Sequence, residues 1–122
     1  GIARCLKEQL PKCQVWLADP EGSALAPAVN QRQAGIAVGA EVTHISGSTL
    51  RLLDKPSGSS IAEGVGTDRK TANFALALDS DLIDGAMVIP DDAIVDMAYH
   101  LLHKDGIWVG PSAAMNVVGA VR

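Results

Sequence analysis

The sequence is short of cysteine and of long apolar runs, and each shortage excludes a class of protein. Cys5 and Cys13 are the only cysteines among 122 residues. They are too few for the disulfide framework of a small secreted domain, and their spacing does not suit a metal site. No apolar run reaches the ~18 residues that a membrane-spanning helix needs. We therefore expect a reducing compartment, the cytoplasm first and the mitochondrion as the alternative.

Positive charge is also scarce. Ten lysines and arginines stand against 14 aspartates and glutamates, which leaves a formal net charge of −4. Such a chain offers no basic stripe for a nucleic-acid backbone. We expect neither nucleic acid nor a membrane as partner. A hydrophobic content of 48% over this length is compatible with one globular core.

Both ends of the sequence predict a piece of a longer chain. Ile2, Leu6 and Leu10 recur every four residues, so an amphipathic helix begins at once. At the other end an apolar segment is still running at Val121, with no glycine or proline to end it. We expect residues 1–122 to be a partial domain truncated at both ends. The native amino terminus, with any targeting peptide, would then lie outside the sequence.

The residue patterns predict alternating helices and strands. Helices are expected at 2–9, 72–78, 91–104 and 112–121, and strands at 14–18, 85–89 and 107–109. Glycines, serines and polar residues interrupt every short apolar run between them, so we expect a long variable loop at 26–58. The alternation favours a three-layer α/β fold with a largely parallel sheet.

The helix expected at 91–104 has the clearest ends. Asp91 is suited to cap its start, and Gly106 is suited to close its end. His100 and His103 lie three residues apart and could be drawn as metal ligands. Histidine near a helix carboxyl end is also favoured by the helix macrodipole, so we expect no metal site.

The main candidate site is the Gly-Pro-Ser turn that precedes the last helix. The strand expected at 107–109 stops at Gly110 and Pro111, and Ser112 then opens an apolar helix. Such a junction presents free backbone N–H groups and a polar side chain at the carboxyl end of a strand, where ligands bind in parallel sheets. The alternative is that Ser112 only caps its helix, which is worth ~1 kcal/mol. The pattern alone favours the cap.

Two weaker candidates lie upstream. In the stretch Glu63-Gly64-Val65-Gly66, here called the 63–66 loop, two glycines let the backbone approach a partner closely, but the third glycine of a phosphate loop is missing. Asp19 and Glu21, two residues apart, could bring two carboxylates to one ligand. An ordinary solvated turn is the better supported interpretation of that pair.

Four stretches together resemble the pyridoxal-phosphate enzymes of the cysteine synthase and cystathionine β-synthase group. The resemblance covers most of the chain, and the order and rough spacing of the stretches match. The stretches are Gly1-Ile2-Ala3-Arg4, Asp19-Pro20-Glu21-Gly22-Ser23-Ala24, Glu63-Gly64-Val65-Gly66 and residues 106–113. The resemblance implies the carboxyl-terminal part of a tryptophan-synthase-β-like fold, fold type II.

The resemblance also implies roles for particular residues. Ser112 would hydrogen-bond the pyridine nitrogen of pyridoxal phosphate, and Glu63, Gly64, Val65 and Gly66 would line the substrate entrance and move with substrate. The Schiff-base lysine and the phosphate-binding loop would belong to a missing amino-terminal half, so no catalytic residue is expected in this fragment. Pro111 and Ala114 stand where the family usually has glycine.

The implied parent enzyme replaces the β-substituent of O-acetylserine or serine with sulfide or a thiol, in cysteine biosynthesis. It would work as a homodimer on a small amino-acid substrate, whereas the fragment alone would be inactive. A serine or threonine dehydratase of the same fold is one alternative. A non-catalytic binding or assembly module that kept the fold is another.

Overall fold

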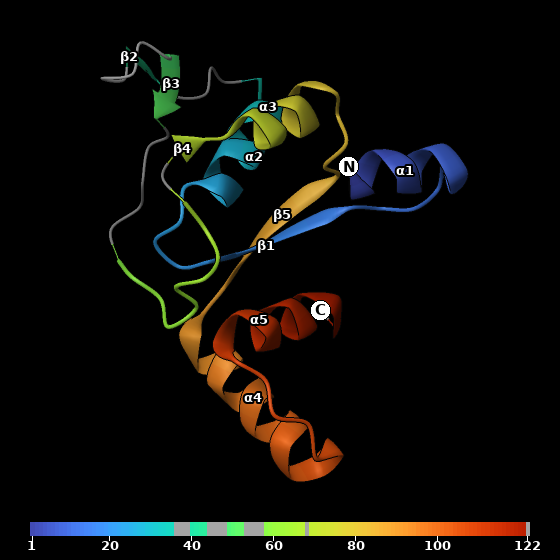
Figure 1. The fold of residues 1–122 in the computed structure, drawn as a ribbon, viewed down its shortest axis with the longest axis vertical. Coiled ribbons are helices and arrows are strands. Elements are labelled where there is room, and N and C mark those ends of the chain that lie inside the picture. Colours follow the sequence, from blue (N-terminus) through green and yellow to red (C-terminus); the bar gives the residue numbers. More distant parts are fainter. Residues whose placement is uncertain (36–39, 44–48, 53–57, 68, 122) are drawn as a thin grey trace.

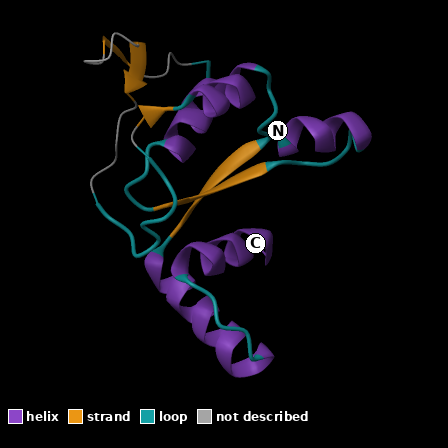
Figure 2. Ribbon diagram, in the orientation of Figure 1, coloured by secondary structure: helices purple, strands orange, loops and turns teal. Residues whose placement is uncertain are grey.

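The computed structural model describes residues 1–35, 40–43, 49–52, 58–67 and 69–121, arranged as alternating helices and strands (Figures 1 and 2). The helices are α1 Ile2–Gln9, α2 Leu25–Gln33, α3 Ala72–Asp79, α4 Asp91–Asp105 and α5 Pro111–Val121. The strands are β1 Trp16–Pro20, β2 Ala40–Thr43, β3 Thr49–Leu52, β4 Arg69–Lys70 and β5 Gly85–Ile89. The expected helices at 2–9, 72–78 and 91–104 and the strand at 85–89 are therefore confirmed.

Strands β1 and β5 run in parallel and form the centre of the molecule. Their register pairs Trp16 with Gly85 at one end and Pro20 with Ile89 at the other. Helix α2 contacts both strands, as does α5, and Figure 1 shows these two helices on opposite sides of the strands. The expected layered α/β arrangement with a parallel sheet is confirmed. It places the carboxyl ends of β1 and β5 next to each other.

The main core lies where α4 and α5 meet the sheet. Ile94 of α4, Met115 of α5 and Ile89 of β5 are fully buried there, together with Ala62 from the loop before β4. Burying each of the two isoleucines and the methionine contributes roughly 1.5–3 kcal/mol. Because Ala62 belongs to this cluster, the chain just before the 63–66 loop is held against the two helices.

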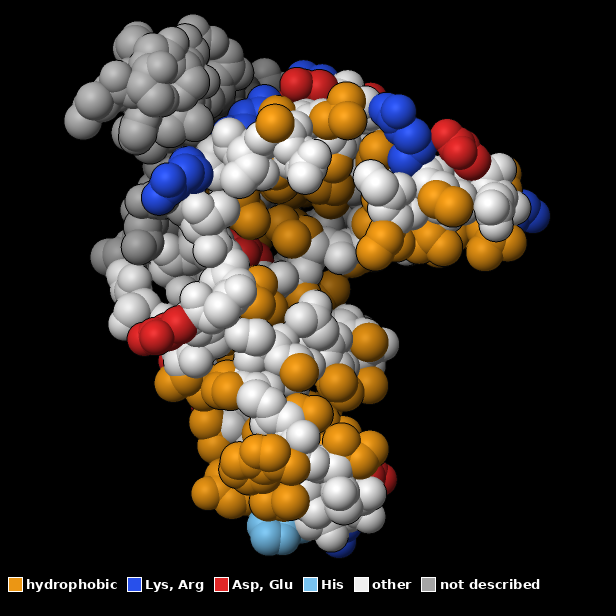
Figure 3. All heavy atoms as spheres, in the orientation of Figure 1, with side chains coloured by type: hydrophobic (Ala, Val, Ile, Leu, Met, Phe, Trp, Pro, Cys, Tyr) orange, Lys and Arg blue, Asp and Glu red, His pale blue; other side chains and the backbone are white. Residues whose placement is uncertain are grey.

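Helix α5 is covered on one face only. Ala114, Met115 and Val118 are buried, as their helical spacing requires. Val121, at the end of this apolar helix, is 69% exposed. Figure 3 shows hydrophobic side chains over the α4–α5 pair and along one side of α1.

The strand expected at 107–109 is not formed. This segment lies outside regular structure, and Trp108 is 80% exposed. A strand needs a neighbour to pair its backbone groups, and no strand of the described chain runs beside this segment. The segment is apolar, as a strand would be, but within the described chain it has no neighbouring strand with which to pair.

The long loop expected at 26–58 begins with helix α2, so that expectation was wrong for its first part. The helix buries the small residues Ala26 and Ala28 with Val29, which give a weak amphipathic signal. Farther on, β2 pairs with β3 and β3 with β4 in an antiparallel sheet that the sequence did not predict. The β3–β4 pairing joins residues that are 17 to 19 positions apart, a separation over which local patterns carry no signal.

The two ends of α4 behave differently from each other. Gly106 closes the helix in the left-handed conformation at φ 69°, as expected. Asp91 does not cap the start, because Pro90 holds the capping position and no side chain accepts a capping hydrogen bond. The Asp91 carboxylate turns instead to residues 60 and 61.

A charge contact joins α1 to the central strands. The carboxylate of Asp84 accepts hydrogen bonds from Lys7 Nζ at 2.6 and 2.8 Å and from the Val15 backbone N–H at 2.6 Å. The Lys7 ammonium, helped by the Val15 N–H, lowers the pKa of the Asp84 carboxyl below its ordinary value of 3.8. The contact therefore favours the ionised form in the folded protein.

Because of this contact, we expect the stability of the fold to fall at acidic pH. Because the pKa of Asp84 is lower in the folded protein, the contact stabilises the fold when the pH is above the unfolded pKa, near 3.8. That stabilisation is lost as the pH falls through the folded-state pKa. We expect Asp84→Asn to lower the free energy of unfolding at pH 7 and to flatten its fall between pH 5 and pH 2. Denaturant unfolding at several pH values across this range measures the free energy of unfolding. Asp81→Asn, which replaces an exposed carboxylate nearby, is the control. An unchanged pH profile for Asp84→Asn would contradict it.

Candidate functional site

Ser112 is the second residue of α5 and not its cap. The helix begins at Pro111, and the carbonyl of Gly110 accepts the first helical hydrogen bonds from Ala113 and Ala114, at 3.1 and 3.0 Å. The capping interpretation of Ser112 is therefore wrong. Proline at the first helical position needs no hydrogen-bond partner for its nitrogen and has a suitable φ, which accounts for Pro111.

The Ser112 hydroxyl is not used by the structure around it. The side chain is half-buried, and within the described chain its oxygen has no hydrogen-bond partner. The Ser112 carbonyl, by contrast, accepts a hydrogen bond from Asn116 Nδ2 at 2.8 Å. Ala114, which stands where the resemblance implies glycine, is fully buried in the core beneath α5. The hydroxyl thus remains available to a ligand.

The 63–66 loop lies against this hydroxyl. A Cβ atom added to Gly64 would stand 3.0 Å from Ser112 Oγ, which is closer than a relaxed contact allows. Glycine at 64 therefore permits the loop backbone to approach Ser112. Two stretches that are 48 positions apart in the sequence, each a candidate on its own, are brought together by the fold.

The far end of the loop is fastened to the turn after β1. Ser23 Oγ accepts a hydrogen bond from the Thr67 N–H at 3.2 Å and lies 3.4 Å from the Thr67 carbonyl, to which it donates. Gly66, at φ 86°, packs so closely that an added Cβ would stand 2.8 Å from Ser23 Oγ and Cβ. Ser23 is buried, and these hydrogen bonds are partly buried at the edge of the loop.

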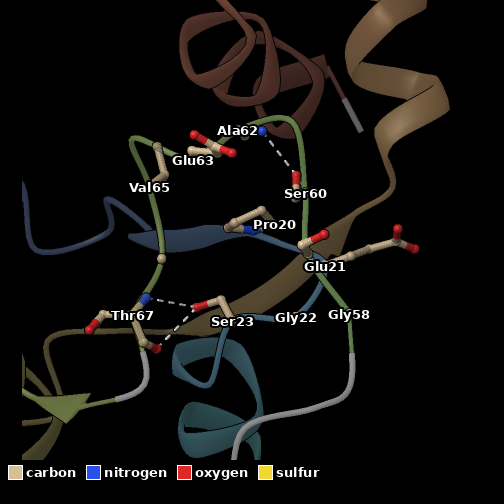
Figure 4. Close-up of a pocket in the computed structure, with 12 residues that line it drawn as sticks. Pro20, Glu21, Gly22, Ser23, Gly58, Ser60, Ala62, Glu63, Val65 and Thr67 are labelled. Atoms are coloured by element: carbon tan, nitrogen blue, oxygen red, sulfur yellow. Dashed lines mark hydrogen bonds between the residues drawn. The ribbon is translucent and has the colours of Figure 1, made fainter.

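A cleft of about 230 Å³ lies between the turn at 20–23 and the chain at 58–67 (Figure 4). Its polar lining consists of hydroxyls and two carboxylates, from Ser23, Ser59, Ser60, Thr67, Glu21 and Glu63. Ser112 is not part of this lining. Glu63 and Val65 line the cleft, while Gly64 faces Ser112, so the 63–66 loop forms a wall between the cleft and the Ser112 hydroxyl.

The two carboxylates of the turn after β1 do not converge. Asp19 is fully buried and accepts a hydrogen bond from the Ala26 N–H at 2.8 Å at the start of α2, whereas Glu21 is exposed. Burial raises the pKa of the Asp19 carboxyl against the opposing hydrogen bonds, of which that from Ala26 is the strongest. Asp19 therefore anchors α2 and is neither a ligand partner of Glu21 nor a solvated turn residue.

Among the described residues, no lysine or histidine lines the cleft. Lys7 pairs with Asp84 and Lys70 with Asp79, and the cleft lining contains no lysine among the described residues. His100 Nε2 lies 4.0 Å from an Asp105 oxygen, and the His103 ring stacks on Tyr99. The described part of the chain holds no group of three residues suited to a metal ion. None of its helices has the length and apolarity that a bilayer crossing requires.

Several residues that shape the site were not assigned this role from the sequence. Ser23 and Thr67 fasten one end of the 63–66 loop, while Ser60 and Asp91 fasten the other. Hydroxyl and carboxylate residues are common in turns, and their partners here are 31 to 44 positions away. A single sequence carries no local signal for such contacts.

Comparison with known proteins gives consistent relationships. A family model described as "Pyridoxal-phosphate dependent enzyme" matches residues 1–122. A cysteine synthase of Dictyostelium discoideum is 38% identical over 122 residues, which is 100% of this chain and 29% of that protein. Cysteine synthase 2 of Schizosaccharomyces pombe is also 38% identical over 122 residues, 100% of this chain and 28% of that protein. The chain thus spans less than a third of these relatives.

Solved structures show the same fold at greater distance. Maize serine racemase has a TM-score of 0.68 and 24% identity over 99% of this chain and 32% of its own. A serine racemase from Dictyostelium discoideum has a TM-score of 0.65 and 17% identity over 99% of this chain and 32% of its own. Identities this low support the fold and not the reaction. The predicted fold class is confirmed.

Proposed function

Because this chain belongs to the family of pyridoxal-phosphate-dependent enzymes, we propose that it is part of the cofactor-binding domain of a longer enzyme of cysteine biosynthesis. The parent would transfer sulfide or a thiol to the β-carbon of O-acetylserine or serine. The observation that carries this proposal is the 38% identity to a cysteine synthase along the whole chain. It agrees with the resemblance found in the four sequence stretches.

The residues present fit the cofactor at one point. Pyridoxal phosphate, when bound, supplies an electron sink for negative charge at the substrate α-carbon. Ser112 offers a half-buried hydroxyl with no partner in the described chain, and Gly64 leaves side-chain-free backbone beside it. A neutral hydroxyl can hydrogen-bond a ring nitrogen without forcing it to stay protonated, as a carboxylate would. We assign Ser112 to the pyridine nitrogen on this ground.

We assign Glu63, Gly64, Val65 and Gly66 to the wall of the substrate entrance. Glu63 is exposed beside the cleft, and Val65 packs on the core that α4 and α5 form. The loop is fastened at both ends and short between them, so it would orient an amino-acid substrate and exclude water from it. The hydroxyls of the cleft provide hydrogen-bonding partners for a polar substrate.

The remaining machinery would come from the rest of the enzyme. The lysine that binds the cofactor and the phosphate-binding loop belong, on this proposal, to an amino-terminal half that packs on the exposed faces of α1 and α5. We therefore propose that residues 1–122 alone are inactive and that the full-length enzyme is a homodimer. Two unpaired cysteines favour the cytoplasm or the mitochondrion. We propose no nucleic-acid partner and no metal.

The test is to purify the full-length enzyme and to record its visible absorbance with added pyridoxal phosphate. O-acetylserine with sulfide, serine with a thiol, and serine or threonine alone are then supplied in turn. We expect bound cofactor and cysteine formation from the first pair, whereas residues 1–122 alone give neither. Release of ammonia without a sulfur product would identify a dehydratase. Absence of both cofactor and turnover would identify a non-catalytic module.

A further inference from the structure

We propose that Asp91 is a positioning residue that fastens the 63–66 loop to the start of α4 and so sets the approach of Gly64 to Ser112. The inference rests on the proposed function, because it gives this approach a catalytic purpose. Asp91 lies in the first turn of α4, 21 positions before Ser112 and 27 after Gly64. It touches no cofactor in this scheme and acts only through the loop.

The contact itself is made of two hydrogen bonds. Ser60 Oγ donates to one oxygen of the Asp91 carboxylate at 2.5 Å, and the Ile61 backbone N–H donates to the other at 3.1 Å. Ser60 Oγ also accepts a hydrogen bond from the Ala62 N–H at 3.1 Å. Hydrogen bonds to an ionised acceptor are stronger than neutral ones. Both oxygens of Asp91 are thus committed to residues 60 and 61.

Asp91 makes these contacts in place of the capping role that its position suggests. Its neighbour Asp92 behaves as an ordinary residue of a helix start, with Oδ1 accepting from the Ala93 N–H at 2.6 Å. Both carboxylates are favoured by the helix macrodipole. Of the two aspartates, only Asp91 accepts hydrogen bonds, within the described chain, from residues 60 and 61, just before the 63–66 loop. Helix stability alone therefore does not explain why Asp91 faces residues 60 and 61.

The same helix pair carries Ser112. Ile94, one turn after Asp91, is buried in one cluster with Met115 of α5 and with Ala62, which directly precedes the loop. Fastening residues 60 and 61 to α4 consequently fixes the loop in the frame that holds Ser112. Two residues beyond Ala62, the Gly64 backbone lies so near the Ser112 hydroxyl that an added Cβ would crowd it. A shift of about 1 Å in such a site is enough to reduce turnover strongly.

The experiment compares Asp91→Ala with Asp92→Ala in the full-length enzyme with cofactor bound. Each variant removes one negative charge from the first turn of α4, but only the first removes the loop contact. We expect amide exchange of residues 61–66 to be roughly tenfold faster in Asp91→Ala and unchanged in Asp92→Ala. We expect kcat for β-replacement to fall roughly tenfold in Asp91→Ala alone, with the KM for amino acid changed much less.

Ser60→Ala gives a second route that leaves α4 intact. It should reproduce part of the Asp91→Ala effect, and the double variant should be no worse than Asp91→Ala alone, because the two residues act through one contact. Equal changes in the Asp91 and Asp92 variants, additive losses in the double variant, or unchanged exchange at 61–66 would each overturn the proposal. Amide exchange needs no turnover, so it decides the role of Asp91 even if the proposed reaction fails.

Discussion

Replacement of Gly66 with alanine is expected to destabilise the full-length enzyme by roughly 2–5 kcal/mol and to reduce its turnover. Gly66 has φ 86°, which costs a residue with a Cβ roughly 1–2 kcal/mol. The added Cβ would also stand 2.8 Å from Ser23 Oγ and 3.1 Å from Pro20 Cγ. Such overpacking costs roughly 1–3 kcal/mol more. Moving Ser23 would also strain its two hydrogen bonds to Thr67 and release the end of the 63–66 loop.

Gly106→Ala is the matched control for this effect. Gly106 also has a positive φ, 69°, but a Cβ there would meet no atom within 4 Å. The Gly106→Ala variant should therefore lose only the roughly 1–2 kcal/mol of stability that a positive φ costs a residue with a Cβ, and its turnover should be unchanged. Denaturant unfolding and β-replacement rates of the two variants, beside the unmodified enzyme, measure the difference. Equal losses of stability and activity would show that the contact with Ser23 is unimportant.

Replacement of Ser112 with alanine is expected to raise the dissociation constant of pyridoxal phosphate roughly tenfold or more. On the proposed assignment, the variant would leave the ring nitrogen without its hydrogen-bond partner, and an unsatisfied group of this kind costs about 1–3 kcal/mol. The visible absorbance of the bound cofactor should shift as well. Stability without cofactor should change by well under the ~1 kcal/mol of a lost cap, because Ser112 is not the capping residue.

Ser112→Asp further separates an effect on helix stability from an effect on the cofactor. A carboxylate in the first turn of α5 favours the helix by roughly 0.3–1 kcal/mol. It would also keep the pyridine nitrogen protonated, so β-replacement should fall while stability is kept or improved. Asn116→Ala serves as control, since it removes the hydrogen bond to the Ser112 carbonyl and leaves the hydroxyl. If alanine changes only the melting temperature and aspartate stays fully active, the assignment of Ser112 must be withdrawn.

Elements with strong local signals could be predicted from the sequence. The spacing of Ile2 and Leu6 marks α1, Pro11 prevents its extension, and Gly106 ends α4 where a left-handed residue is needed. The apolar stretch at 85–89 becomes β5 within the same bounds. Ser112 and the 63–66 loop were also named in advance, from motif and resemblance. In each case the information lies within a few residues of the chain.

Contacts between distant residues could be decided only by the tertiary structure. α2 begins where the buried Asp19 carboxylate receives the Ala26 N–H, and its small buried side chains leave little pattern to read. Asp91 has the sequence of a cap, yet its oxygens are taken by Ser60 and Ile61. A side chain with several acceptable partners binds the one that folding brings nearest. The site role of the loop and of Ser112 stays a prediction from the resemblance, whereas their closeness was determined by packing alone.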